Sequence, residues 1–278
     1  MDRKIFRTLR NGLAGLAAFG SMLAATPVSA QGDLLVAPTR VILDGRRGTE
    51  VILSNIGTEE ATYRIGLELR RMTPDGSLED ITSENANEKE QAALSMLRYA
   101  PRRITLPPGQ PQAVRIAARP DADLPDGEYR VHMAFRAIPK PTPVTEADAN
   151  AEGLSVRLIP VYGVTIPIMI RHGRIEAQVA MAQPQVVQGP KGPMLRLAMT
   201  RNGESSTYGE LRVTRPGASD PVFMMRGVAI YPEVHDRVLL LPLSPEQAAA
   251  MKGPLRFEYR ELPEAGGGVI AAVDAVLG

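Results

Sequence analysis

The side chains that most often carry acid–base or metal chemistry are few and scattered in this sequence. There are three histidines, His132, His172 and His235, and no cysteine. No two histidines stand at a spacing typical of metal ligands, and the neighbouring Glu59 and Glu60 fall in a polar segment where both are expected to be solvated. The sequence has no G-x-S-x-G nucleophile motif, no P-loop and no dinucleotide fingerprint. We therefore expect no catalytic residues, no metal or other cofactor, and no enzymatic activity.

Arg40 is the residue whose position suggests a specific binding chemistry. It stands in "APTRVILDG", inside the first predicted apolar strand, and shares a face there with Val36 and Ile42. An arginine on an apolar face needs an anionic partner, because burying an unpaired charge is costly. The alternative is an edge arginine whose guanidinium group reaches water along its apolar stem.

The longest alternating pattern in the chain lies in "GLSVRLIPVYGVTIPIMIRHG". Every even-numbered residue from Leu154 to Ile170 is apolar, which indicates an extended strand with one buried face. The segment contains Pro160 and Pro167, and because proline donates no ladder hydrogen bond, we expect an edge strand rather than an interior one. Such an edge is unusual, since natural sheets keep their edges short and charged.

The N-terminal segment indicates export. A basic stretch, "MDRKIFRTLR", precedes the apolar "GLAGLAAFGSMLAA" and the small-residue sequence "TPVSA". This order is typical of a secretory signal, with cleavage expected after Ala30. A membrane anchor is the alternative, but the apolar run is too short to cross about 30 Å of hydrocarbon as a helix. The formal net charge of +1 includes this basic leader, and no basic patch with interleaved aromatic residues follows it, so we expect no nucleic-acid partner.

The remainder of the chain reads as two series of short strands. Residues 34–139 contain apolar segments separated by turns such as "DGRRG", "TPDGS" and "LPDG", and residues 174–278 contain about seven more. Helical pieces are expected only at Gln91–Leu97 and after Ser244, a plausible N-cap. This pattern predicts an all-β protein of two immunoglobulin-like β-sandwich domains. The predicted domains cover residues 31–171 and 172–278, with a hinge near Arg171–Gly173.

The order of the first segments resembles a known family. "PTRVILDG", "VILSNIGTEEATYRI", "ITLPPGQPQAVRI" and "HMAFRAIP", then a polar loop and a long alternating strand ending in arginine, resemble the N-terminal domain of periplasmic pilus chaperones of the chaperone–usher pathway. The resemblance covers residues 34–171, and residues 174–278 fit the family's second immunoglobulin-like domain by strand count. It implies two sandwiches in an angled, boomerang-like arrangement and a location in the periplasm.

The resemblance also implies a function for the long strand. In this family the last strand of the first domain is lent to an incomplete pilin-like or spore-coat-like secreted subunit, which the chaperone delivers to an outer-membrane usher. Burial of three or four apolar side chains in a subunit is worth several kcal/mol at about 25 cal/mol per Å². An apolar edge also predicts a dimer in which two copies cap each other. The residues that match the donor segment are Leu154, Val156, Leu158 and Tyr162.

The same resemblance suggests a role for Arg40. It matches the family's first-strand arginine, which binds the C-terminal carboxylate of the subunit. The lysine that usually accompanies this arginine aligns with Pro167 here, and the long strand contains no lysine. Arg157 and Arg171 are the candidates to replace that cation.

Two other functions stay open from the sequence. One is a secreted structural or adhesive β-sandwich protein whose long strand pairs within its own sheet. The other is a periplasmic ligand-binding module with its ligand in the cleft between the domains.

Overall fold

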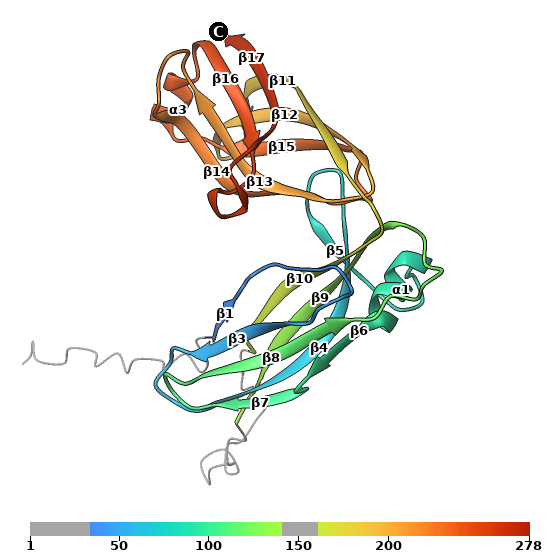
Figure 1. Ribbon diagram of the computed structural model, residues 1–278. Coiled ribbons are helices and arrows are strands. Elements are labelled where there is room, and N and C mark those ends of the chain that lie inside the picture. Colours follow the sequence, from blue (N-terminus) through green and yellow to red (C-terminus); the bar gives the residue numbers. More distant parts are fainter. Residues whose placement is uncertain (1–33, 141–160) are drawn as a thin grey trace, which may run out of the picture. The chain divides into compact units, whose positions relative to one another are not determined.

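The computed structural model describes residues 34–140 and 161–278, and these residues form an all-β structure of four sheets (Figure 1). The all-β class predicted from the sequence is therefore confirmed. The described residues belong to one compact unit of the chain. No helix in this part of the chain is long and apolar enough to cross a membrane. The predicted signal peptide, residues 1–30 with cleavage after Ala30, lies outside the described residues.

Two sheets form the first sandwich. One has the strand order β1 (Leu34–Ala37), β3 (Thr49–Asn55), β8 (Pro111–Ala118) and β6 (Leu97–Ala100). The other has the order β2 (Val41–Leu43), β10 (Gly163–His172), β9 (Gly127–Ile138), β4 (Ala61–Met72) and β5 (Leu78–Ile81), with β7 (Arg103–Leu106) also pairing with β4.

Alternating side chains from both sheets fill the core of this sandwich. On β9, the odd-numbered residues from Tyr129 to Phe135 point inward and are at most 2% exposed. Leu53 from β3 and Ile116 from β8 meet them from the other sheet. This period of two is the pattern that the sequence shows, because successive side chains of a strand point to opposite faces.

Helix α1 (Glu88–Met96) lies between β5 and β6 in the chain. It begins three residues before the predicted Gln91–Leu97, because Asn87 caps it and Glu90 completes a capping box. Its buried residues, Ala93 and Met96, join the core of the first sandwich.

Seven strands form the second sandwich, as the sequence predicted. One sheet has the order β11 (Ala177–Gly189), β12 (Gly192–Gly203) and β15 (Asp236–Pro242). The other has the order β14 (Pro221–Ile230), β13 (Thr207–Thr214), β16 (Gly253–Arg260) and β17 (Val269–Leu277). Short helix α3 (Pro245–Ala250) starts at the predicted cap Ser244, and the turn η1 (Pro263–Ala265) lies between β16 and β17. The domain division at residues 171 and 172 and the hinge near Arg171–Gly173 stay predictions.

Strand β10 corrects the prediction that the long strand is an edge throughout. It pairs with β9 along its whole length, and Ile168–Ile170 also pair with β2 in parallel. These three residues are therefore interior to the sheet. Among the described residues, no strand pairs with β10 on the β2 side between Gly163 and Pro167. Because β2 is three residues long, Gly163–Pro167 at one end of β10 and Arg171 and His172 at the other have no pairing strand on this side in the described part of the chain.

Candidate functional site

The apolar row of β10 leaves the protein's own core at its N-terminal end. Ile166, Ile168 and Ile170 are at most 1% exposed and belong to the first core, whereas Val164 is only partly buried. Tyr162, which has the same parity and lies just before β10, is 51% exposed. The buried face predicted for the even-numbered residues is thus confirmed from 164 to 170. The other predicted donor residues, Leu154, Val156 and Leu158, lie outside the described residues.

Backbone groups of β10 face the open edge. The N–H of Ala137 on β9 donates to the carbonyl oxygen of Tyr162 at 2.9 Å, which makes these two residues a hydrogen-bonded pair. Hydrogen-bonded pairs alternate with non-hydrogen-bonded pairs in an antiparallel ladder, so Gly163, Thr165 and Pro167 direct their backbone polar atoms away from β9. Pro167 is accommodated because its nitrogen occupies a position where β9 requires no donor.

Arg40 lies in the bend between β1 and β2, so its placement within a strand was wrong. Val36 is buried and Ile42 is 50% exposed, so the two do not share an inward face. The reason is that the chain changes sheets at this bend: β1 pairs with β3, whereas β2 pairs with β10. When a chain passes from one sheet to another, the alternation of inward and outward side chains is interrupted, even where the apolar pattern of the sequence continues.

The guanidinium group of Arg40 is held by neutral groups. Its Nη2 donates to Ser206 Oγ at 2.8 Å, and its Nη1 donates to the hydroxyl of Tyr231 at 3.4 Å. The ring centre of Tyr208 lies 4.7 Å from its Cζ, which is cation–π distance. Within residues 34–140 and 161–278, no carboxylate forms an ion pair with Arg40. This half-buried cation is therefore oriented by its neighbours without being neutralised by them.

Glu128 connects Arg40 to Arg171 through Ser206. The Glu128 side chain is fully buried, and its Oε2 accepts from Arg171 Nε at 3.0 Å. The same oxygen accepts from the N–H of Ser206 at 3.1 Å and from its hydroxyl at 2.8 Å. Because the Ser206 hydroxyl donates to Glu128, its oxygen lone pairs are directed to Arg40 as acceptor.

Arg171 differs from Arg40 in already having an anionic partner. Besides the ion pair with Glu128, its Nη2 donates to the carbonyl oxygen of Ser206 at 3.1 Å. Arg171 lines the same pocket as Arg40, but Glu128 balances its charge, and its role as the replacement cation stays a prediction. The other candidate cation, Arg157, lies outside the described residues.

A pocket of about 600 Å³ opens beside Arg40. Its volume lies within the range of sites that enclose small ligands or side chains. Arg171, Ser206 and Tyr208 line it together with Arg40, and apolar walls come from Ile42 and other residues. The acidic residues that line it are Glu261 and Glu264, from the segment between β16 and β17.

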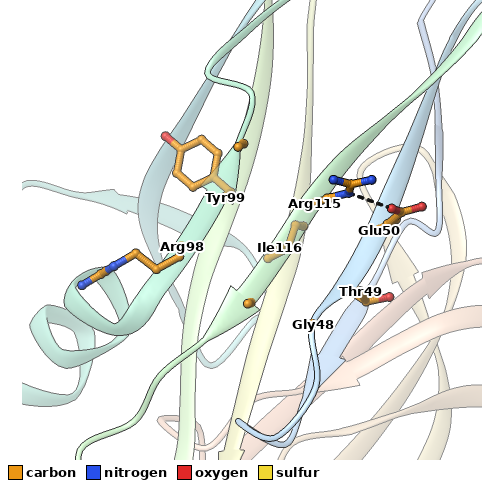
Figure 2. Close-up of a pocket in the computed structure, with 9 residues that line it drawn as sticks. Gly48, Thr49, Glu50, Arg98, Tyr99, Arg115 and Ile116 are labelled. Atoms are coloured by element: carbon orange, nitrogen blue, oxygen red, sulfur yellow. Dashed lines mark hydrogen bonds and ion pairs between the residues drawn. The ribbon is translucent and has the colours of Figure 1, made fainter.

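A second hollow, of about 490 Å³, lies over β3, β6 and β8 and offers no comparable charge (Figure 2). Arg115 and Glu50 form an ion pair across it, with Nε and Oε1 3.2 Å apart. Arg98 donates to the carbonyl oxygens of Ser95 and Leu97. Both arginines that line this hollow thus already have partners.

The polar row of β9 is buried, although its sequence suggests a solvated face. The row consists of Glu128, Arg130 and His132, which alternate with the core residues. Arg130 packs on the ring of Tyr231, with Cζ 3.6 Å from the ring centre, and its Nη1 donates to Glu233 Oε2 at 3.1 Å. Sequence reasoning missed these contacts because the residues that cover Arg130 lie about a hundred positions away.

His132 is 2% exposed, and both of its ring nitrogens lack a hydrogen-bond partner among the described residues. Burial, together with the positive charges of Arg130 and Arg70, lowers the pKa of His132 to about 3. The folded protein therefore holds this imidazole neutral across the physiological pH range.

This pKa predicts acid sensitivity. Below pH 6.5 the unfolded chain binds a proton on His132 that the folded protein does not bind until about pH 3. We expect this residue to lower the free energy of unfolding by about 2 kcal/mol between pH 7 and pH 5. Denaturant unfolding of the variant His132→Leu should show a correspondingly smaller decrease in the free energy of unfolding between pH 7 and pH 5. The matched variant His235→Gln, at a 61% exposed side chain, should keep the pH dependence of the wild type, and equal slopes in all three proteins would contradict the prediction.

The other histidines show no arrangement for metal binding. His172 ends β10, and His235 contacts Asn202 and Asp236 at the surface. Within the described part of the chain, no group of three or more His, Cys, Asp or Glu residues could hold a metal ion.

The fold and the site together describe a protein of two immunoglobulin-like sandwiches. The first sandwich has an open strand edge, and its Arg40 lies beside a pocket without an anionic partner among the described residues. Neither a family model nor a curated protein matches the sequence. Among solved structures, the chain is similar to the E. coli chaperone DraB, with 14% identity, a TM-score of 0.46, and coverage of 88% of this chain and 97% of that one.

Two further structures are similar over the same share of this chain. The Salmonella enterica SafA pilin–SafB chaperone complex gives 16% identity, a TM-score of 0.45 and 97% coverage of the matched chain. The CsuC–CsuE chaperone–tip adhesion subunit complex of Acinetobacter baumannii gives 11%, 0.46 and 98%. These structures contain chaperones, the class that the sequence resembles. At such identities and TM-scores the similarity does not indicate the function of this chain. The functional argument depends on the residues described above.

Proposed function

We propose that this protein is a non-catalytic periplasmic chaperone that binds pilin-like or spore-coat-like secreted subunits through the strand edge at β10. The bound subunit would gain a strand, and the chaperone would then deliver it to an outer-membrane usher. The single observation that carries this proposal is the apolar row that is buried at Ile166 and exposed at Tyr162. A row that continues beyond its own core has apolar side chains available to the core of a partner.

The open edge supports the same proposal. Gly163 and Thr165 direct backbone donors and acceptors away from β9, and a partner strand satisfies such groups by β-augmentation. A dimer that caps this edge stays a prediction. The donor side chains are proposed to be Leu154, Val156, Leu158 and Tyr162, of which only Tyr162 lies in the described part of the chain.

Arg40 supports a second contact with the subunit. Its guanidinium group is oriented by Ser206 and Tyr208 and forms no ion pair among the described residues. A subunit's C-terminal carboxylate is an anion that this group would bind by charge-assisted hydrogen bonds. The positive charge of Arg171 would add to the electrostatic attraction for this carboxylate, although Arg171 stays paired with Glu128.

Co-expression with secreted subunits encoded beside its gene tests the proposal. The wild type is expected to recover a one-to-one complex in pull-down, whereas the folded double variant Val156→Glu/Leu158→Glu is expected to recover none. Charged side chains would have to enter the core of the subunit, which is costly. Unchanged recovery by the double variant would contradict a donor strand and favour a sandwich whose long strand serves only its own sheet.

A pair of proline substitutions separates the two edges of β10. Val164→Pro removes an N–H that pairs with β9 and should lower the free energy of unfolding by about 3 kcal/mol. Thr165→Pro removes an N–H that faces the open edge, so the protein should stay folded but bind the subunit more weakly. Urea unfolding and pull-down of both variants provide the check. Full subunit binding by Thr165→Pro would show that the partner strand does not pair at this position.

A further inference from the structure

The pocket beside Arg40 contains two kinds of unneutralised charge. Arg40 forms no ion pair within the described residues, and the same holds for Glu261 and Glu264. Apolar side chains, among them Leu262 and Ile270, line the same pocket. A complementary ligand has a carboxylate, an apolar stem and a cation on one molecule.

We infer that this pocket receives the last residue of the bound polypeptide and favours a C-terminal lysine or arginine. This inference rests on the proposed function, because it takes Arg40 as the partner of the C-terminal carboxylate. The methylene groups of the terminal side chain lie along Leu262 and Ile270, as long basic side chains commonly do on apolar surfaces. The terminal ammonium or guanidinium group lies near Glu261 and Glu264.

The charges distinguish a polypeptide end from a free amino acid. A free amino acid has an ammonium group next to its carboxylate, and binding would bring that cation close to Arg40. In a polypeptide the same nitrogen is a neutral amide. A C-terminal glutamate or aspartate is disfavoured, because its side chain would face two carboxylates and like charges repel.

Glu261 and Glu264 are exposed, which limits the size of the effect. Pairs between exposed charges are worth below about 1 kcal/mol each. A terminal lysine gains attraction from these carboxylates, whereas a terminal glutamate suffers repulsion. We therefore expect the two ends to differ by about tenfold in Kd at low salt, with a smaller ratio at high salt.

Peptides of one alternating valine–threonine sequence test the inference by fluorescence anisotropy. Four ends are compared: lysine, leucine and glutamate with free carboxylates, and lysine as the amide. The purified chain should bind the lysine acid about tenfold more tightly than the glutamate acid. The double variant Glu261→Gln/Glu264→Gln should reduce this ratio to about twofold or less. The matched variant Glu79→Gln/Glu246→Gln, which changes the net charge equally at exposed residues outside the pocket, should keep it.

The outcomes separate the inference from the proposed function. Equal affinity for the lysine and glutamate acids, or an unchanged ratio in Glu261→Gln/Glu264→Gln, overturns the inference even if free acids bind better than the amide. Equal affinity for the lysine acid and its amide overturns the inference and also the proposed carboxylate contact of Arg40. Absence of saturable binding by every peptide overturns the pocket as a C-terminal site, while the subunit pull-down decides the strand function independently.

Discussion

Replacing Arg201 with leucine is expected to lower the free energy of unfolding by about 4 kcal/mol, the largest effect predicted here for a single side chain. Arg201 on β12 is 4% exposed and donates to backbone carbonyl oxygens rather than to a carboxylate. Its Nη1 donates to Gly203 at 2.6 Å and to Ser205 at 3.0 Å. Its Nη2 donates to Pro232 at 2.7 Å, and its Nε to Val234 at 3.3 Å.

The cost arises because leucine fills the space but leaves these carbonyls without a donor. Each buried unsatisfied group costs about 1–3 kcal/mol, and some of the four will find water instead. Burial lowers the pKa of Arg201, so removal of a desolvated charge offsets part of the loss. Guanidinium unfolding monitored by circular dichroism measures the difference.

Arg196→Leu is the matched control for this prediction. Arg196 lies on the same strand with the opposite parity, and the described residues provide it with no hydrogen-bond partner. Its substitution should change the free energy of unfolding by about 0.5 kcal/mol or less. A similar decrease in the free energy of unfolding in the two variants would show that the hydrogen bonds from Arg201 to the carbonyl groups contribute little to stability.

Glu128→Ala is expected to cost about 3 kcal/mol, because it leaves Arg171 without its anion and Ser206 without its acceptor. The Arg171 side chain is 34% exposed, so water compensates part of its loss. The hydroxyl of Ser206 then has no acceptor to fix its orientation, and its contact with Arg40 should loosen. Thermal and denaturant unfolding report the first effect, and the preference for a free C-terminal carboxylate in the peptide assay reports the second.

Glu204 provides a comparison for Glu128. It pairs with Lys89 at 2.7 Å, but both side chains are about half exposed. Glu204→Ala should therefore cost below about 1 kcal/mol. A double-mutant cycle of Glu128→Ala with Arg171→Ala isolates the pair itself. A coupling energy near zero would mean that the hydrogen bonds to Ser206, and not the ion pair, make Glu128 important.

Some features of the site could have been found by closer reading of the sequence. Arg201 continues the parity of Leu195, Leu197 and Met199, which are all buried on β12. A charged residue at the end of an apolar row predicts either an edge position or a buried guanidinium group with acceptors. Glu128 carried no such signal, because its row on β9 continues with Arg130 and His132 and reads as a solvated face.

The sequence by itself determined most of the strands, the inward face of β10 and one of the two helix caps. The even-numbered row of β10 from Val164 to Ile170 and the cap at Ser244 were both predictable, because alternation and capping depend on residues only a few positions apart. These local patterns also sufficed for the all-β class and for the seven strands of the second sandwich.

Only the tertiary structure decided which groups meet. Arg40 contacts Ser206 and Tyr231, which lie 166 and 191 residues away in the chain. The same long-range packing buries the polar row of β9 and places Ile168–Ile170 of β10 beside β2. A residue's local pattern fixes the direction of its side chain relative to its own strand, but the neighbour that it meets depends on how distant strands pair and cross.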